Sequence, residues 1–363
     1  MKSEEYAFLI VDDSDTDLNS CELAVHDINT SSNKKINLLR AKSSEEYHAI
    51  LERERVDGAI IDIQLKEGDY KDGNDIIKNI VGKYRIPIAI VTGNPQEIGP
   101  EYGCIKQYIK PYRYSEVINE LVESRKTPLF RVLRSEGIIE EMLLEIFWKT
   151  LCPNFKTLET LPKDRADRII LRNVMAYLEE LLDRKDSSFH QEEIYLQPLF
   201  DDRTRTGWIV CKNTTKEKYI VLSPPCDLEV YSGETKTDCV VLCEIENTEK
   251  TCHKSCDKKR QKDNKEPNKS DVETIVKHLL NNGHEYCHYL PKNSLFEGGL
   301  INFRMVSSVS VGKLKEEYRV EVRVHDSFVK EIMRRFSSYF ARQGQPNLDN
   351  KSEISRITKE YKK

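Results

Sequence analysis

The sequence predicts an α/β domain in its first third, a doubly wound five-stranded parallel sheet, followed by a helical segment and a small, mostly β, barrel-like domain. Three observations support this. Short apolar runs alternate with amphipathic stretches over residues 1–126, which is typical of buried parallel strands linked by helices. Residues 127–192 have a helical period, and residues 193–346 carry short strand patterns separated by long loops. We expect the polar tail, 347–363, to be frayed.

The first segment contains five apolar runs that we expect to form strands. They are Ala7 to Val11, Ile36 to Ala41, Val56 to Ile61, Ile86 to Val91 and Ile105 to Ile109. The stretches expected to be helices are Asp15 to Ile28, a segment opened by Ser43, Asn74 to Tyr84 and Ser115 to Ser124. Ser43 precedes two early acids, as a helix cap does. Because βαβ crossovers are right-handed, this order predicts one doubly wound sheet.

Five polar residues stand directly after these apolar runs: Asp12, Asp13, Asp62, Thr92 and Lys110. In an open α/β sheet, ligands bind outside the carboxyl ends of the strands, so we expect these side chains to converge. Three carboxylates, a hydroxyl and an ammonium group suit a divalent cation and a phosphoryl group. Taken alone, Asp12 and Asp13 have a simpler interpretation, as a cap of the following helix.

These residues, in this order, resemble the functional set of response-regulator receiver domains, which have a flavodoxin-like fold. The resemblance covers about a third of the chain. It implies that Asp62 is the phospho-acceptor for a cognate histidine kinase or phosphotransfer protein. It also implies that Thr92 and Lys110 contact the phosphoryl oxygens. Finally, it implies a Mg²⁺ ion, held by the side chains of Asp12, Asp13 and Asp62 and the backbone carbonyl of Gln64.

From this resemblance we expect a response regulator of a two-component phosphorelay, a phosphoprotein that catalyses its own phosphoryl transfer and hydrolysis but is not otherwise an enzyme. Its C-terminal part would be a partner-binding output module. Two alternatives stay open: a phosphate sink for the kinase, and a phosphorylation-controlled, nuclease-like effector of phage defence. The helical segment after residue 126 lacks a helix-turn-helix pattern, so we do not expect DNA binding.

Two departures from the family pattern concern the output face. The family has an aromatic residue three positions before the lysine, which changes rotamer on phosphorylation, whereas this chain has Gln107 there and Tyr108 one position later. Either the aromatic lever is absent or the last strand is shifted by one residue. Glycines and prolines between Gly93 and Gly103 leave room for little more than one helical turn. We therefore expect a shortened fourth helix and a non-standard dimerisation mode.

Gln64 and Asn94 follow Asp62 and Thr92 by two residues, and we expect both to flank the phosphoryl site. Their amides are candidates for orienting an attacking water, which would shorten the lifetime of the acyl phosphate. The alternative is that both side chains simply face solvent.

The helical segment carries two apolar stripes. They consist of Ile138, Ile139, Met142, Leu143, Ile146 and Phe147, and of Ile169, Ile170, Val174, Tyr177, Leu178 and Leu181. We expect two antiparallel helices around the connection Leu151 to Pro162, which pair with the same helices of another chain. His190 lies beyond these helices, so we do not expect a phosphorylatable histidine on them.

The β-rich segment is expected to form a small, strongly bent barrel closed by a helix. Its predicted elements are Gly207 to Cys211, Tyr219 to Leu222, Cys239 to Glu246, Leu300 to Val311, Tyr318 to Val324 and the helix Ser327 to Phe340. Residues 219–228 and 334–346 are reminiscent of PemK/MazF toxin-like barrels. This resemblance implies an RNA-cleaving site with the candidates Ser223, Cys226, Asp227, Arg334, Arg335 and Arg342. We favour the alternative, a rigid turn after a buried strand with Cys226 as a small core residue.

Cysteines and histidines between residues 252 and 288 raise the question of a zinc site. They are Cys252, His253, Cys256, His284, Cys287 and His288. The spacing lacks a CxxC knuckle, and the intervening residues 257–271 are so charged that we expect a disordered excursion. Zinc is therefore possible but not the favoured interpretation.

The overall composition sets few further limits. The chain has 363 residues, 33% of them charged, and a net charge of −4, so neither nucleic acid nor a membrane is indicated by charge. No apolar run is long enough to span a membrane, and no secretory signal precedes the two aspartates. We expect a cytoplasmic protein with no membrane association, whose ten cysteines are reduced thiols.

Overall fold

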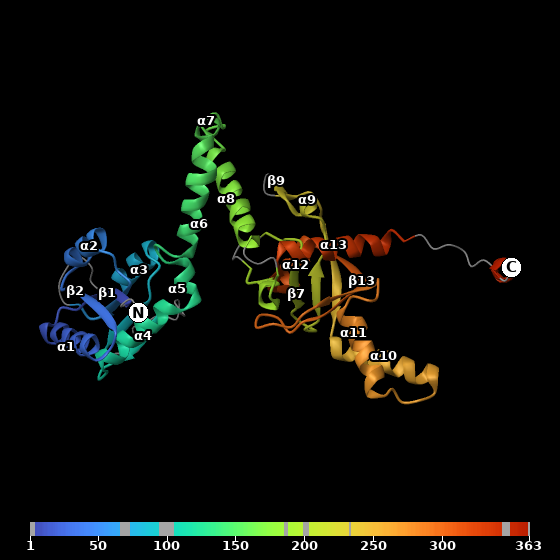
Figure 1. Ribbon diagram of the computed structural model, residues 1–363, viewed down its shortest axis with the longest axis horizontal. Coiled ribbons are helices and arrows are strands. Elements are labelled where there is room, and N and C mark those ends of the chain that lie inside the picture. The colour runs from blue at the N-terminus through green and yellow to red at the C-terminus, as the bar shows by residue number, and fades with distance from the viewer. Residues whose placement is uncertain are drawn as a thin grey trace. The chain divides into compact units, whose positions relative to one another are not determined.

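The structure is a computed structural model in which the chain divides into two compact units, Met1–Ser187 and Ser188–Lys363 (Figure 1). It describes residues 4–65, 73–93, 105–184, 188–198, 203–231, 234–342 and 349–361. The first unit contains the predicted α/β domain together with the helical segment. The second contains the β-rich part and the C-terminal helix.

The first unit is built on a five-stranded, all-parallel sheet with the order β2-β1-β3-β4-β5. The strands are β1 (Glu4–Val11), β2 (Lys34–Ala41), β3 (Gly58–Asp62), β4 (Ile88–Thr92) and β5 (Lys106–Ile109). Every residue of β3 and β4 is buried, as expected for central strands covered on both faces. The predicted doubly wound fold is confirmed, and the strand order is the flavodoxin-like one.

Helices cover both faces of this sheet. They are α1 (Asp15–Ser31), α2 (Ser44–Arg53), α3 (Gly73–Lys83) and α4 (Tyr114–Lys126). Alternate residues of β1 divide the core: Phe8 and Ile10 pack with α1 and α4, whereas Leu9 and Val11 pack with α2 and α3. The Ser43 side chain accepts the backbone N–H of Glu46, so the predicted cap of α2 is present. The predicted short helix after Gly93 lies outside the described residues.

A buried ion pair ties the sheet to its last helix. Arg125 in α4 and Asp57, just before β3, are 5% and 2% exposed, and their closest contact joins Arg125 Nη2 to Asp57 Oδ1 at 2.5 Å. The other carboxylate oxygen accepts the backbone N–H of Ala7 in β1 at 3.1 Å. Burial alone would raise the pKa of Asp57, but Arg125 and the Ala7 N–H hold it below its ordinary value.

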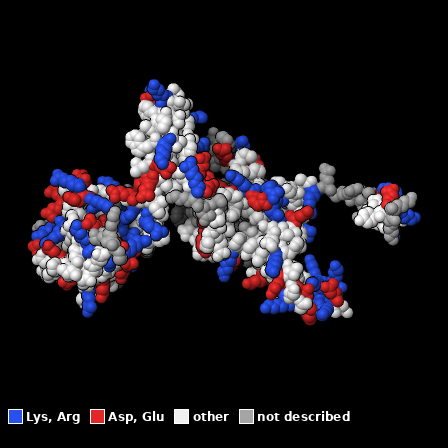
Figure 2. Space-filling view, viewed as in Figure 1, with Lys and Arg blue, Asp and Glu red and all other residues white. Residues whose placement is uncertain are grey.

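The helical segment forms a hairpin. Its helices are α5 (Pro128–Leu133), α6 (Ile138–Ile146), which continues through a π-helical turn (Phe147–Leu151), α7 (Phe155–Leu158) and α8 (Ala166–Asp183). The predicted stripes of α6 and α8 are partly buried, yet α8 has no fully buried residue. Leu144, Trp148, Leu171 and Met175 stay exposed, and most of the upper hairpin is free of charge in the view of Figure 2. Pairing with a second chain stays a prediction.

The second unit is organised around a seven-stranded sheet with the order β12-β13-β11-β8-β7-β14-β6 and antiparallel pairing throughout. The strands are β6 (Tyr195–Leu196), β7 (Trp208–Lys212), β8 (Lys218–Val221), β11 (Cys239–Glu246), β12 (Cys287–Leu290), β13 (Gly299–Ser310) and β14 (Tyr318–Val324); β9 (Val230–Tyr231) and β10 (Glu234–Thr235) form a separate ribbon. Among the described residues the sheet is open, with β12 and β6 at its edges. The antiparallel β domain is therefore confirmed, although the strand order is not that of a closed barrel.

Both faces of this sheet bury apolar side chains. One cluster includes Ile209, Phe303 and Val324 with Ile332 of α13 (Asp326–Phe340), and the other includes Trp208 and Leu242 with Leu314 of α12 (Val311–Glu317). The remaining helices are α9 (Pro225–Leu228), α10 (Thr248–Asp263), α11 (Lys269–Leu280) and α14 (Lys351–Tyr361).

Three local expectations were wrong. The charged segment 257–271 is not a disordered excursion: it belongs largely to α10 and α11, because Asn268 and Asp271 form a capping box and Lys259 pairs with Asp271 at 2.6 Å. Figure 2 shows how densely charges crowd this pair of helices. Cys226 is not a core residue but is exposed, since α9 places it on the surface. The tail contains the solvent-exposed helix α14.

The membrane prediction concerns helix length and apolarity. Within the described part of the chain, the helices are either too short or too polar to cross a bilayer.

The buried ion pair leads to a stability prediction. Replacing Asp57 by Ala leaves the Arg125 guanidinium buried without its carboxylate, and we expect a loss of about 3–5 kcal/mol from the first unit. Native-state amide exchange of peptides from β1 and β3, followed by mass spectrometry, measures this unit separately from the second. Glu5→Ala, which breaks the exposed pair with Lys35, is the control and should leave exchange unchanged.

The same pair also predicts a pH dependence. The folded-state pKa of Asp57 is depressed, so its contribution to stability is present above the unfolded-state value of about 3.9 and is lost as the pH falls through the folded-state value. At neutral pH this contribution should be fully present. Equal exchange protection of Asp57→Ala and the unmodified chain at that pH would show that the pair does not stabilise the unit.

Candidate functional site

The predicted polar residues gather at the carboxyl edge of the parallel sheet. Asp12 follows β1, Asp62 and Thr92 are the last residues of β3 and β4, and Lys110 follows β5. In the strand register, Val91 lies beside Asp62 and Ile109 beside Thr92, and the Lys110 N–H donates to the Thr92 carbonyl at 3.0 Å. Asp12 and Thr92 are fully buried, and Asp62 is 6% exposed.

Asp62 is held from two sides. Its Oδ2 atom lies 3.3 Å from Lys110 Nζ, and its Oδ1 atom accepts the backbone N–H of Gln64 at 2.9 Å. Gly73, at the start of α3, packs directly on this strand end, where a Cβ atom would collide with the Asp62 carbonyl oxygen. The absence of a side chain at Gly73 therefore lets α3 approach the strand that carries Asp62.

Asp12 has an incomplete set of hydrogen bonds. Its Oδ1 atom accepts the backbone N–H of Ser14 at 2.8 Å, whereas its Oδ2 atom is buried with no hydrogen-bond partner. Burial raises the pKa of Asp12 to about 6, the carboxylates of Asp62 and Asp17 act in the same direction, and the Ser14 N–H opposes them. An orphaned buried oxygen between like charges is a position where a cation would be stabilised.

Lys110 links two carboxylates. Its Nζ atom lies 3.3 Å from Asp62 Oδ2 and also 3.3 Å from Asp17 Oδ2. Burial by itself would lower the pKa of Lys110, but these two carboxylates outweigh it and the pKa lies above its ordinary value. The ammonium group is therefore charged at neutral pH and held at the sheet edge. The peptide bond between Lys110 and the next residue, Pro111, is cis.

The donor set fits a small divalent cation. Mg²⁺ is usually held by one or two carboxylates, with waters and phosphate oxygens completing its octahedron. Asp12 and Asp62 supply the two carboxylates, and the Gln64 carbonyl lies two residues after Asp62. Asp13 is only partly buried at the start of this edge. Among the residues that the structure describes, no three His, Cys, Asp or Glu side chains converge on a common metal position, so an all-protein cage is not present there.

Asp17 and Tyr114 were not predicted as part of this site. Asp17 lies in the first turn of α1, and its Oδ1 atom accepts the Tyr114 hydroxyl at 3.5 Å. The Tyr112 hydroxyl in turn donates to the Tyr114 oxygen at 3.0 Å. The available signal was the spacing: Asp17 lies about one helical turn after Asp12 and Asp13, so the first turn of α1 brings it back to the same edge.

The structure decides the register of the last strand. Tyr108 pairs with Val91, packs on the core shared by α1 and α4, and donates to Glu120 at 2.8 Å. Gln107 is exposed and occupies the position three residues before Lys110. In this register the position three residues before Lys110 carries the exposed Gln107, so no aromatic side chain stands there.

Of the two polar residues expected to flank the site, Gln64 and Asn94, the structure describes Gln64. The Gln64 side chain is exposed, and its Oε1 atom would lie 4.0 Å from a Cβ placed on Gly93, directly after Thr92. Gln64 therefore reaches from the end of β3 toward the end of β4. Asn94 lies outside the described residues.

The nuclease candidates of the second unit are not brought together. Cys226 lines one cavity, whereas Arg334, Arg335 and Arg342 line another that shares no residue with it. Ser223 is buried, and its Oγ atom accepts the Val241 N–H at 2.8 Å. Arg335 donates to three backbone carbonyls, those of Asn282, His284 and Cys287, so its role is structural.

The cysteine and histidine residues of the second unit do not form a metal site in the part of the chain that is described. Cys252 packs instead against the small apolar cluster of Leu279, Cys287 and Leu300. The zinc interpretation therefore gains no support from the geometry.

Comparison with solved structures finds similarity to the first third of the chain. No family model and no curated protein match this sequence. Among solved structures, the chemotaxis response regulator CheY4 of Vibrio cholerae is 18% identical and matches with a TM-score of 0.28, covering 33% of this chain and 98% of that one. The PhyR receiver domain of Erythrobacter litoralis is 20% identical, with a TM-score of 0.27 and coverages of 34% and 95%.

A receiver domain protein from Methanospirillum hungatei JF-1 is 21% identical, with a TM-score of 0.27 and coverages of 34% and 98%. These identities and TM-scores do not extend the similarity to function. The part of the first unit that these structures cover has the flavodoxin-like strand order described above.

Proposed function

We propose that this protein is a response regulator whose first unit accepts a phosphoryl group on Asp62 from a phosphohistidine of a kinase or phosphotransfer protein. The observation that carries the proposal is the surroundings of Asp62: its carboxylate lies 3.3 Å from the Lys110 ammonium and beside the orphaned carboxylate oxygen of Asp12. A nucleophile, a cation and a candidate metal ligand therefore meet at the edge where α/β sheets bind ligands.

Each residue has a defined part in the proposed transfer. An oxygen of Asp62 attacks phosphorus, the bond from phosphorus to the histidine nitrogen breaks, and the imidazole leaves with that electron pair. Lys110 neutralises the charge of the phosphoryl oxygens, and the Thr92 hydroxyl donates a hydrogen bond to one of them. The Gln64 N–H, bonded to Oδ1, holds the carboxylate in place. A Mg²⁺ ion on Asp12 and Asp62 would supply further charge neutralisation.

Phosphorylation would also change the partner of Lys110. The ammonium group is shared between Asp62 and Asp17, and a phosphoryl group on Asp62 adds nearly two negative charges on one side. We propose that Lys110 then moves toward the phosphoryl group and weakens its contact with Asp17. Because Asp17 belongs to α1 and accepts from Tyr114 of α4, the signal would leave through these helices rather than through an aromatic residue on β5.

The proposed output is a partner-binding second unit. A phosphorylation-controlled nuclease is less well supported. Its candidate arginines, Arg334, Arg335 and Arg342, line a different cavity from its candidate Cys226.

The first test is covalent labelling. Full-length protein incubated with acetyl phosphate and Mg²⁺ should gain the mass of one phosphoryl group, which hydroxylamine removes, and Asp62→Asn should abolish the gain because the nucleophile is lost. Asp75→Asn, on the exposed surface of α3, is the matched control and should label normally. Labelling of Asp62→Asn at the normal rate would refute the assignment of the acceptor.

The second test concerns the metal. Asp12→Asn removes the carboxylate with the orphaned oxygen, and we expect Mg²⁺ affinity, measured by isothermal titration calorimetry, to fall by about 10- to 100-fold or more, since even residues that only orient metal ligands have effects of this size. Asp15→Asn is the control. Asp15 is exposed at the start of α1, three residues after Asp12, and pairs with Lys42. Equal affinities of the two variants would exclude Asp12 as a ligand.

The third test concerns the lifetime of the phosphorylated form. If the Gln64 amide orients the attacking water, Gln64→Ala and Asn94→Ala lengthen the half-life of the purified phosphoprotein, followed by loss of the phosphate mass. Lys78→Ala, on the surface of α3, should leave the half-life unchanged. Identical half-lives for all variants would mean that both amides only face solvent.

A further inference from the structure

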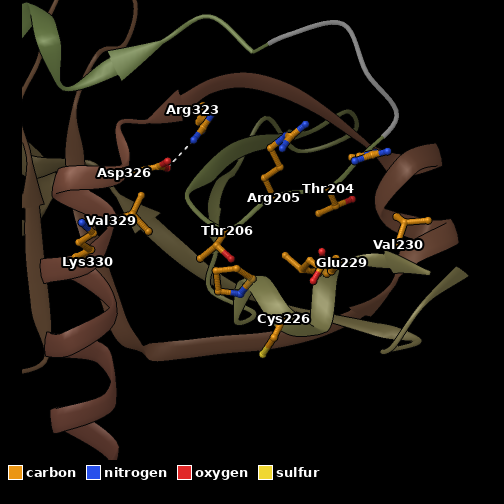
Figure 3. A pocket seen from close by; sticks show the side chains of 13 residues that line it. Thr204, Arg205, Thr206, Cys226, Glu229, Val230, Arg323, Asp326, Val329 and Lys330 are labelled. Atoms are coloured by element: carbon orange, nitrogen blue, oxygen red, sulfur yellow. Dashed lines mark hydrogen bonds and ion pairs between the residues drawn. The ribbon is translucent and has the colours of Figure 1, made fainter. Parts of the chain in front are cut away.

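The second unit contains a cavity of about 640 Å³, and Cys226 is the one residue of the predicted sites among its described lining residues. Three segments surround it: residues 203–206 before β7, residues 225–230 around α9, and residues 323–330 at the start of α13. Figure 3 shows side chains from all three segments around the same space, among them Arg205, Glu229 and Arg323. A concave site of this size, formed by segments distant in sequence, is large enough for a small organic ligand.

The charge of the lining favours an anion. Four cationic side chains line the cavity, Arg203, Arg205, Arg323 and Lys330, against the two carboxylates of Glu229 and Asp326. Arg323 Nη2 and Asp326 Oδ1 lie 2.5 Å apart, and this pair is visible at the rim in Figure 3. Among the described residues of the lining, cations therefore outnumber carboxylates four to two, although the whole chain has a net charge of −4.

Buried contacts hold the lining in place. Thr204 and Thr206 are buried, and the Thr206 hydroxyl donates to the Ser223 carbonyl at 2.6 Å. Next to them Gly207 has a φ of +83°, and a Cβ there would collide with Val329 of α13, so the segment before β7 packs closely on that helix. Arg323 Nε is buried with no hydrogen-bond partner. A guanidinium group binds two oxygens of a phosphate group through a pair of hydrogen bonds. Arginines held in place by a packed backbone therefore suit a phosphate ligand.

A second cavity continues from the first. It measures about 440 Å³, shares Arg203, Thr204 and Val230 with it, and adds Lys315 of α12 and Asp238. The two cavities, together called the groove, therefore adjoin at these shared residues, and their linings combine cationic side chains with apolar ones such as Leu228 and Val329. Such a groove suits a ligand in which phosphates alternate with less polar groups.

We propose that this groove binds a phosphate ester, either a nucleotide or the backbone of a single-stranded nucleic acid. The proposal concerns binding and assigns no cleavage. It also does not depend on phosphorylation of Asp62, since every residue of the groove belongs to the second unit.

The test compares two phosphate-bearing probes on the full-length chain. A fluorescein-labelled single-stranded RNA oligonucleotide is followed by anisotropy, and AMP is measured by calorimetry. Arg203→Gln with Arg205→Gln should weaken binding by about tenfold or more, because hydrogen bonds to charged groups are lost. Lys330→Gln should weaken it in the same direction. Arg334→Gln is the matched control, since Arg334 lies on the same helix, pairs with Glu331 and lines a different cavity.

The two phosphate sources give different results. Contact with about three backbone phosphates predicts that log affinity for RNA falls with log salt with a slope of about −2, whereas AMP shows a weaker dependence. Binding of RNA alone assigns the groove to nucleic acid, and equal binding of both probes assigns it to nucleotides. The proposal is overturned if neither probe binds at millimolar concentration, or if Lys330→Gln and the folded double variant bind as Arg334→Gln does. Equal binding of poly-glutamate would likewise reject it in favour of an acidic protein partner.

Discussion

The site at the sheet edge depends on one shared cation. Lys110 is within 3.3 Å of carboxylate oxygens from both Asp62 and Asp17, while the neighbouring Asp12 is fully buried. Carboxylates removed from water cost several kcal/mol each unless they are paired, so this cluster is tolerable only with a cation in place. The Asp12 oxygen without a partner shows that compensation is incomplete in the protein alone. A cation bound at this oxygen would complete the compensation.

The second buried charge pair has the opposite character. Asp57 and Arg125 pair at the other end of β3, and Ala7 of β1 adds a backbone donor, while Arg125 Nη1 is buried with no hydrogen-bond partner. This pair fastens α4 to the centre of the sheet. Since Tyr114, which contacts Asp17, lies on the same helix, the pair would also limit how α4 responds to the proposed change of partner of Lys110. One end of the helix is thus fixed, and the end near the site carries the contacts that phosphorylation would alter.

The second unit has apolar clusters and a groove of its own. Its sheet buries apolar side chains on both faces, yet the segment before β7, the turn around α9 and the start of α13 leave a groove in whose described lining cations outnumber carboxylates. Gly207 makes the close approach of two of these segments possible. The arginines on the far part of α13 instead support the fold, as Arg335 does through three backbone carbonyls. On α13, Lys330 therefore lines the groove, whereas Arg335 supports the fold, and the residues around each one make the difference.

The sequence by itself determined the doubly wound sheet and four members of its site, because apolar runs of strand length end at Asp12, Asp62, Thr92 and Lys110 and parallel strands end at a common edge. It also predicted the extents of β11 and β14 correctly from their alternation. Other features were decided only by tertiary structure. The roles of Asp17 and Arg125 depend on partners dozens of residues away, and α10 with α11 is stabilised by caps and an ion pair that outweigh a polar composition. The groove arises where three distant segments meet, and local patterns carry no information about such meetings.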